Sequence, residues 1–125
     1  MINLETTEKF INSELTTKIN NSFIKHSELK LFTDGNDLVE VILFLKNNSK
    51  TKFRQLIDIT AVDYPEKEKR FKMIYLLLSH ENNQRIKIEF EIKENDMVNS
   101  ITSIYPAANW MEREVFDMYG ISFKD

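Results

Sequence analysis

The 125-residue sequence contains no cysteine and only two glycines, two prolines and two histidines. The absence of cysteine excludes disulfides, thiolate zinc sites and cysteine-bound iron–sulfur clusters. Gly35 and Gly120 are too few for a nucleotide-binding loop, in which several glycines let backbone amides approach the phosphates. His26 and His80 have no neighbouring ligand pattern, so we expect them in turns or on the surface rather than at a metal.

Charge and hydropathy exclude further classes of protein. A formal net charge of -3 and a pI near 5.5 give no basic footprint, so we expect no nucleic acid as a partner. The apolar runs, such as 41–45 and 74–78, are far shorter than the roughly 20 residues that span a bilayer. The first ten residues lack the pattern of a secretory or transit signal. We therefore expect one globular domain over residues 1–125 that reaches a membrane only through partners.

Hydrophobic spacing predicts two helices in the first half of the chain. Residues 3–23 carry apolar side chains at mostly helical intervals, which predicts an amphipathic opening helix. A short strand is predicted over 28–33, and 34–36 is a turn signal. Asp37 begins a capping pattern for a second helix that should end near 47–48.

Three strands are predicted in the middle of the chain, over 53–62, 70–79 and 85–92. The second, FKMIYLLLS, is almost wholly apolar and belongs in the interior of a sheet. The third alternates apolar and charged residues, as a strand with one wet face does, and 80–84 is a hairpin turn before it. Together these elements predict an α+β fold, an antiparallel or mixed β-sheet packed with N-terminal and C-terminal helices.

Asp58 and Asp63 are the candidates for a pair that performs acid–base chemistry. Five positions apart on one strand, they should face opposite sides of it. We therefore expect them to be solvated or hydrogen-bonded at a sheet edge or turn.

The stretch NWMEREVFDMYGISF, residues 109–123, is dense in acids and aromatic rings. Asn109 as N-cap with Glu112 three residues on predicts a short helix over 110–119. Gly120 fits the left-handed position that ends it, and Ile121 could pack back on Phe116.

The predicted helix has two faces. Arg113 and Asp117, four apart, can form an ion pair. Glu114 lies among apolar neighbours, so it is either buried with a donor or extended into water on its flexible stem. The residues expected to share its face are Ala107, Met111, Val115 and Met118.

Residues 105–123, YPAANWMEREVFDMYGISF, resemble the signature of the thirty-kilodalton subunit of respiratory complex I, known as the C subunit in bacteria and as subunit nine in mitochondria. LIDITAVDYP at 56–65 and FKMIYLLLS at 71–79 resemble the family's central strands, so the resemblance covers about residues 30–123. In the family a glycine-histidine-proline step, a basic stretch and a long tail follow. The resemblance therefore implies a chain that is short at its C-terminus.

The resemblance implies a non-catalytic structural subunit in the peripheral arm of NADH:quinone oxidoreductase, supporting electron transfer from NADH to quinone. This chain would bind no cofactor, whereas the complex holds FMN, iron–sulfur clusters and quinone. Its partners would be the large subunit at the quinone site and neighbouring iron–sulfur subunits, on the cytoplasmic or matrix side of the inner membrane. The expected partner-interface residues are Trp110, Glu112, Arg113, Glu114, Phe116, Asp117, Tyr119 and Gly120.

Three alternatives stay open from the sequence. The protein could be the equivalent subunit of a related membrane-bound hydrogenase or dehydrogenase. It could be a stand-alone hydrolase that uses Glu114 and Asp117. It could also be a free regulatory binding module.

Overall fold

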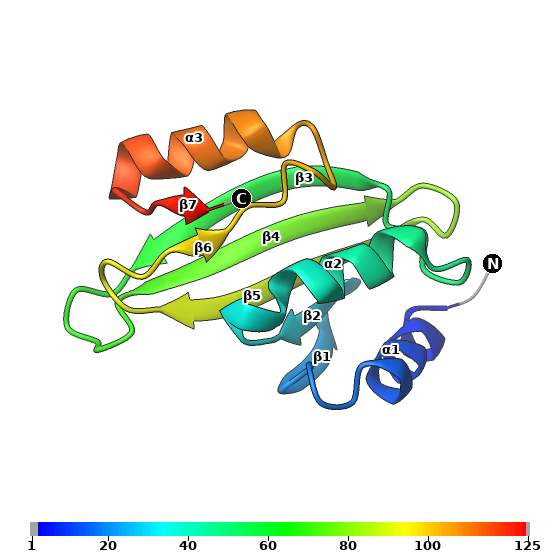
Figure 1. The fold of residues 1–125 in the computed structure, drawn as a ribbon. Helices are drawn as coiled ribbons and strands as arrows, with labels where there is room; N and C mark the ends of the chain where they lie inside the picture. Colours follow the sequence, from blue (N-terminus) through cyan, green and yellow to red (C-terminus); the bar gives the residue numbers. More distant parts are fainter. Residues whose placement is uncertain (1–2, 125) are drawn as a thin grey trace.

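A five-stranded mixed sheet forms one layer of the computed structural model, which describes residues 3–124, and helices lie along one of its faces (Figure 1). The helices are α1 (Leu4–Glu14), α2 (Leu38–Asn47), which follows a short 3-10 turn η1 (Gly35–Asp37), and α3 (Ala108–Tyr119). The strands are β1 (Asn21–Lys25), β2 (Glu28–Phe32), β3 (Gln55–Asp63), β4 (Phe71–Ser79), β5 (Gln84–Ile92), β6 (Val98–Asn99) and β7 (Phe123–Lys124). The predicted α+β class is confirmed.

The sheet has the order β1-β2-β5-β4-β3, so β4 and β5 occupy its interior and β1 and β3 its edges. All neighbouring pairs are antiparallel except β2 and β5, which run parallel. This parallel pair makes the sheet mixed, and α2, β3 and β4 form the crossover between its two strands. The two short strands β6 and β7 pair in parallel near α3 (Figure 1).

The core lies between the sheet and the three helices. Alternate residues of β4, among them Met73, Tyr75 and Leu77, are fully buried beneath them, and β5 contributes Ile86 and Ile88. The helices contribute apolar side chains at helical spacing, as expected for elements with one buried stripe. Those on α1, α2 and α3 are Ile11, Leu38, Val41, Ile42, Leu45, Ala108 and Val115.

The predicted opening helix is wrong beyond residue 14. Helix α1 ends at Glu14, and residues 21–25 form strand β1 instead, in a hairpin with β2. His26 and Ser27 form its two-residue turn with φ values of 54° and 62°, the left-handed pair of a type I′ turn. Because neither residue is glycine, the usual sequence signal for this turn is missing. The asparagines and serine at 20–22 favour turns over helix interiors, which is the physical reason for the break.

The remaining element predictions are confirmed within two residues at each end. Helix α2 ends at Asn47, and the three central strands begin at Gln55, Phe71 and Gln84. The capping detail differs, since the Asp37 side chain makes no capping hydrogen bond to α2.

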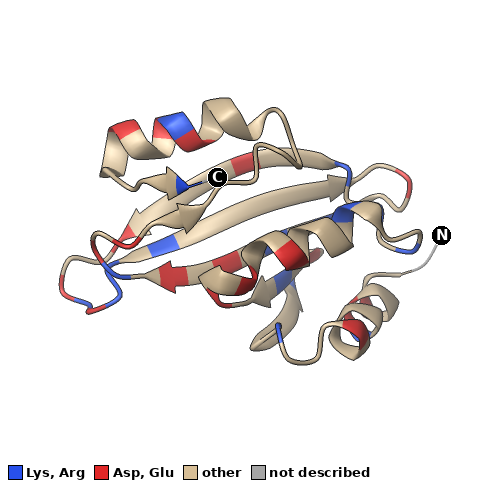
Figure 2. Ribbon diagram, viewed as in Figure 1, with Lys and Arg blue, Asp and Glu red and all other residues tan. Residues whose placement is uncertain are grey.

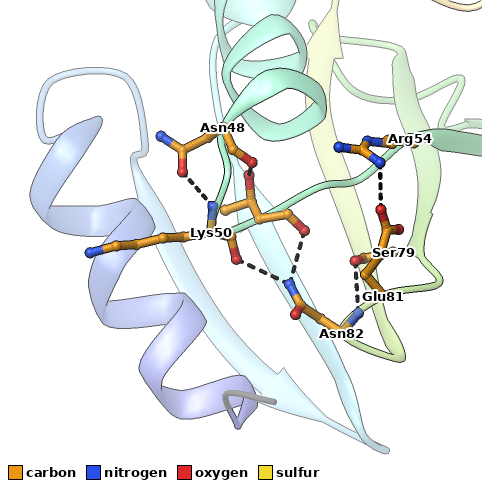
Figure 3. Close-up of polar contacts among 7 residues, drawn as sticks. Asn48, Lys50, Arg54, Ser79, Glu81 and Asn82 are labelled. Carbon is orange, nitrogen blue, oxygen red and sulfur yellow. Dashed lines mark hydrogen bonds and ion pairs between the residues drawn. The ribbon is translucent and has the colours of Figure 1, made fainter.

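The loop after α2 is fastened to the β4–β5 hairpin (Figure 3). The Asn82 side-chain amide donates to the carbonyls of Lys50 (3.0 Å) and Thr51 (3.2 Å). Beside it, Arg54 pairs with Glu81 at 2.6 Å. These contacts hold the hairpin turn, predicted at 80–84, against the start of β3. They lie at the end of the sheet opposite the C-terminus of α3.

Candidate functional site

Helix α3 begins earlier than predicted, and its N-cap is Ala107 rather than Asn109. Ala107 makes no side-chain capping bond. Instead the preceding backbone turns supply acceptors, since Ala108 N–H donates to the carbonyl of Tyr105 at 2.9 Å and Asn109 N–H to that of Pro106 at 3.2 Å. Backbone carbonyls of the turns before the helix therefore take the place of the expected capping box as acceptors for the first N–H groups.

The segment before α3 is anchored through Tyr105. Its buried hydroxyl donates to the carbonyl of Phe53, just before β3, and its ring lies against the Lys46 ammonium, 5.2 Å from the centroid. Burial raises the pKa of Tyr105, so the hydroxyl stays protonated as a donor. Lys46 also donates to the carbonyl of Ile104. These contacts fix where the helix starts on the sheet.

The buried face of α3 differs from the expected one. Ala108, Glu112 and Val115 point into the core, with Met111 and Tyr119 beside them at partial burial. Of the expected face, Val115 and the partly buried Met111 belong to this buried face, whereas Glu114 and Met118 are exposed. The spacing 108, 112, 115 and 119 is itself a helical stripe, and three of these positions lie within the helix predicted over 110–119.

Glu112 is the buried acid of this helix, with 6% of its surface exposed. One carboxylate oxygen accepts from the Ser100 hydroxyl at 2.7 Å, and the other accepts from the backbone N–H of Ile101 at 2.8 Å. Both carboxylate oxygens therefore have a hydrogen-bond donor despite their burial, as buried polar groups require. Glu112 therefore ties α3 to the segment that follows β6, within its own chain.

Tyr75 on β4 lies under the same helix. Its hydroxyl is buried and has no hydrogen-bond partner among residues 3–124. Burial, and secondly the negative charge of Glu112, raise the pKa of Tyr75 well above its ordinary value. This phenol is therefore neutral and cannot serve as a base.

The C-terminus of α3 is built as predicted. Gly120 adopts φ 73°, and its N–H donates to the carbonyl of Phe116 at 2.8 Å. Tyr119 meets Phe71 of β4 edge to face, with ring centroids 6.1 Å apart. Ile121 is buried, whereas Phe116 remains half exposed, so the contact between these two stays a prediction.

The outward side of α3 carries large apolar side chains in solvent. Trp110 is 66% exposed, Met118 73% and Phe116 51%. Arg113, Glu114 and Asp117 lie between them, and in the described part of the chain none of the three side chains forms a hydrogen bond or ion pair. The predicted Arg113–Asp117 pair is thus not formed, and Glu114 takes the solvent-exposed alternative. We call these six residues the α3 outer face; Figure 2 shows charges of both signs on this helix.

Asp58 and Asp63, the candidate acid–base pair, have separate surroundings in the structure. Asp63 receives two hydrogen bonds from the Arg70 guanidinium, at 2.7 and 2.9 Å, which lower the pKa of Asp63 and raise that of Arg70. Asp58 is exposed on the edge strand β3. Both positions fit the expectation of solvated or hydrogen-bonded polar residues.

His26 and His80 both lie in turns. Over residues 3–124, no cluster of three histidine or carboxylate side chains could hold a metal ion. None of the helices described is long and apolar enough to span a bilayer.

Known respiratory proteins are similar to this chain over most of its length. The family model described as the respiratory-chain NADH dehydrogenase 30 Kd subunit matches residues 31–125. The C subunit of the NADH-quinone oxidoreductase of Ruegeria pomeroyi is 50% identical over 100 residues, 80% of this chain and 50% of that protein. The C subunit of the Xanthobacter autotrophicus enzyme is 42% identical over 113 residues, 90% of this chain and 54% of that protein. The chain thus spans about half the length of these relatives.

Among solved structures, a chain of the membrane-bound sulfane sulfur reductase, an archaeal respiratory membrane complex, has the same fold. The TM-score is 0.84 at 22% identity, over 96% of this chain and 69% of that one. At this identity the likeness concerns the fold alone. The range matched by the family model agrees with the resemblance over residues 30–123, and the chain belongs to the family of the 30 kDa subunit of the respiratory-chain NADH dehydrogenase.

Proposed function

We propose that this chain is a non-catalytic structural subunit in the peripheral arm of an NADH:quinone oxidoreductase. It supports electron transfer from NADH to quinone by holding other subunits in place. The observation that carries this proposal is the α3 outer face, on a chain of this family. Within residues 3–124 its apolar side chains are exposed and its charged side chains are unpaired. A neighbouring subunit would cover the apolar side chains and pair with the charged ones.

The composition of the α3 outer face supports a protein partner. Trp and Arg are enriched among the residues that dominate binding energy at interfaces, and Trp110 lies beside Arg113 one helical turn on. Glu114 and Asp117 are free to pair with cations of the partner, because no residue in the described part of this chain neutralises them. Helix α3 is held rigidly by Glu112 and Tyr105, so the face is presented in one orientation.

The proposal assigns the redox groups to other subunits. A protein that holds FMN needs a flavin-binding site, one that holds an iron–sulfur cluster needs cysteine ligands, and one that binds quinone needs a quinone pocket. This sequence has no cysteine for a cluster and too few glycines for a nucleotide loop. Its partners are then the large subunit at the quinone site and adjoining iron–sulfur subunits. Its location is peripheral, at the cytoplasmic or matrix side of the inner membrane.

The test is co-purification of the tagged native protein with the complex. Trp110→Ala should reduce the recovery of the other subunits, because truncating an aromatic anchor costs about 2–4 kcal/mol of binding. Leu43→Ala is the matched control, since Leu43 is an apolar side chain 41% exposed on α2. Recovery of the native chain without iron–sulfur subunits would refute the proposal. Equal recovery with Trp110→Ala and Leu43→Ala would refute the role of α3.

A second candidate is the equivalent subunit of a related membrane-bound complex. The observation that favours it is the fold shared with a chain of the sulfane sulfur reductase complex. Both candidates use the same docking surface but differ in the electron donor. Recovery of a flavoprotein that oxidises NADH selects the first candidate, and recovery of a hydrogenase or other reductase subunit selects the second.

A further inference from the structure

The sheet face turned away from the helices is covered by no helix of residues 3–124 (Figure 1). On β4 this face presents Ile74, Leu76 and Leu78, which alternate with the buried core residues of the same strand and are themselves only half-buried. In an antiparallel region with one wet face, these outward positions are normally polar. The run FKMIYLLLS instead has the composition of a strand buried on both faces. Within residues 3–124 the fold fully buries only the face of β4 that is turned toward the helices.

Basic side chains border this apolar stripe. In the strand register Lys87 pairs with Leu76, Arg85 with Leu78, and Lys30 with Lys87, so the cations lie on the same face beside the stripe. Two lysines directly opposite each other repel, and only Lys87 has an acidic partner, Glu28 at 3.5 Å. We call Lys30, Ile74, Leu76, Leu78, Arg85 and Lys87 the open sheet face.

On the same face the strand register places Glu28 opposite Arg85 and Asp58 opposite Leu76, so two acids of this chain offset part of the positive charge. The exposed Arg85 side chain forms no ion pair or hydrogen bond within residues 3–124, and the Lys30 ammonium only lies over the ring of Phe23, 5.7 Å from its centroid. The whole chain is acidic, with a net charge of -3, whereas around this stripe three cations outnumber the two acids. Carboxylates supplied from outside would complement this excess of cations.

We propose that the open sheet face docks an acidic segment of a partner protein. Apolar side chains of the segment cover Leu76 and its neighbours, and its carboxylates meet Lys30, Arg85 and Lys87. An anionic bilayer fits less well, because Glu89 and Glu91 lie on the same face at the other end of β5. This surface is separate from the α3 outer face, which lies on the helical layer. The inference rests on the proposed function only in that an assembly supplies the partner.

The absence of cysteine makes a direct test possible in the assembled complex. Leu76→Cys, with Glu14→Cys on the exposed end of α1 as control, is introduced into the tagged native chain. Maleimide labelling is compared between the isolated chain and the purified complex. We expect labelling of Leu76→Cys to fall about tenfold or more in the complex, because the core of an interface excludes water. Labelling of Glu14→Cys should stay the same.

Carbodiimide cross-linking of the same complex identifies the occupant. This reagent joins a lysine to a carboxylate in contact, and mass spectrometry should find Lys30 or Lys87 joined to an Asp or Glu of another subunit. The internal link between Lys87 and Glu28 in the isolated chain serves as the positive control. Lys30→Glu should abolish its own cross-link and weaken retention of that subunit, whereas Lys9→Glu on α1 should not.

The outcomes separate this inference from the proposed function. If the chain is in the complex but Leu76→Cys labels freely, the open sheet face is not an interface, while the proposed function stands. If the chain is in no complex and labels freely, both fail. Protection with a cross-link to a second copy of this chain refutes the acidic partner. Protection reproduced by phosphatidylglycerol vesicles alone refutes it in favour of a membrane surface.

Discussion

Replacement of Glu112 by alanine is the strongest test of how α3 is attached. The change removes a buried carboxylate that accepts from Ser100 at 2.7 Å and from the backbone N–H of Ile101 at 2.8 Å. Ser100 keeps a second partner, Thr102 at 3.0 Å, so its hydroxyl remains satisfied. The N–H of Ile101 loses its acceptor in the interior, and a buried donor without a partner is costly.

The magnitude follows from these two bonds. Hydrogen bonds to a charged group contribute about 1.5–3 kcal/mol each, so we expect Glu112→Ala to lower the free energy of unfolding by about 3–6 kcal/mol. Glu112→Gln retains an acceptor oxygen for Ile101 and should lose about 1–2 kcal/mol. For a domain of this length the alanine variant should melt about 10–20 °C lower.

Urea unfolding of the isolated chain, followed by far-UV circular dichroism, measures both variants. Glu114→Ala is the matched control, because Glu114 is an acid on the same helix that is exposed and unbonded within residues 3–124. A surface change of this kind should stay within about 0.5 kcal/mol. If Glu112→Ala loses less than about 1 kcal/mol, or if Glu114→Ala loses as much, the assignment of Glu112 as the internal anchor is wrong.

Three further predictions concern single groups. Tyr75→Phe should leave stability unchanged or raise it by up to about 1 kcal/mol, because it removes a buried hydroxyl without a partner in residues 3–124; a loss in urea unfolding would contradict this. Gly120→Ala should cost about 1 kcal/mol through backbone strain alone, since φ is 73° and an added Cβ meets no atom within 4 Å; Gly120→Asn should lose less, and equal stability of all three would refute the strain. Arg70 lowers the pKa of Asp63 below its ordinary 3.8, so the stability that Asp63 contributes is present above that pH and is lost as pH falls through the lower, folded value. The difference between the native chain and Asp63→Asn should therefore vanish in acid-titrated unfolding, and a difference that persists at the lowest pH would show that the pair is not its source.

The sequence predicted most of the fold because periodicity reports burial directly. The alternation in β5 and the apolar stripe in α2 each place one face in the core, and both elements lie at the predicted positions. The prediction fails over 15–23, where a weak apolar pattern continues past the end of α1. The hairpin there turns on His26 and Ser27, which carry none of the glycine signal of such turns. Residues 21–25 pair with β2 as a strand, and this pairing overrides the helical pattern of their apolar residues.

The candidate site is predictable in location but not in detail. The stretch 109–123 stands out by its density of acids and aromatic rings, and six of its residues form the α3 outer face. The sequence does not resolve the roles of its two central glutamates, because which one is buried depends on how the helix is rotated against the sheet. That rotation is set by contacts from segments that precede the helix, through Tyr105 and Ser100.

The sequence by itself determined that this chain holds no thiolate chemistry, that it forms an α+β domain, and that it ends its last helix at Gly120. These follow from composition, from periods of two and 3.6 residues, and from backbone sterics, all of which are local. Only the tertiary structure decided that Glu112 is the buried acid and Glu114 the free one. It also decided that β4, apolar along both sides, is covered by helices of residues 3–124 on one side alone. Both outcomes depend on how elements distant in sequence are placed against each other, and no local pattern encodes that placement.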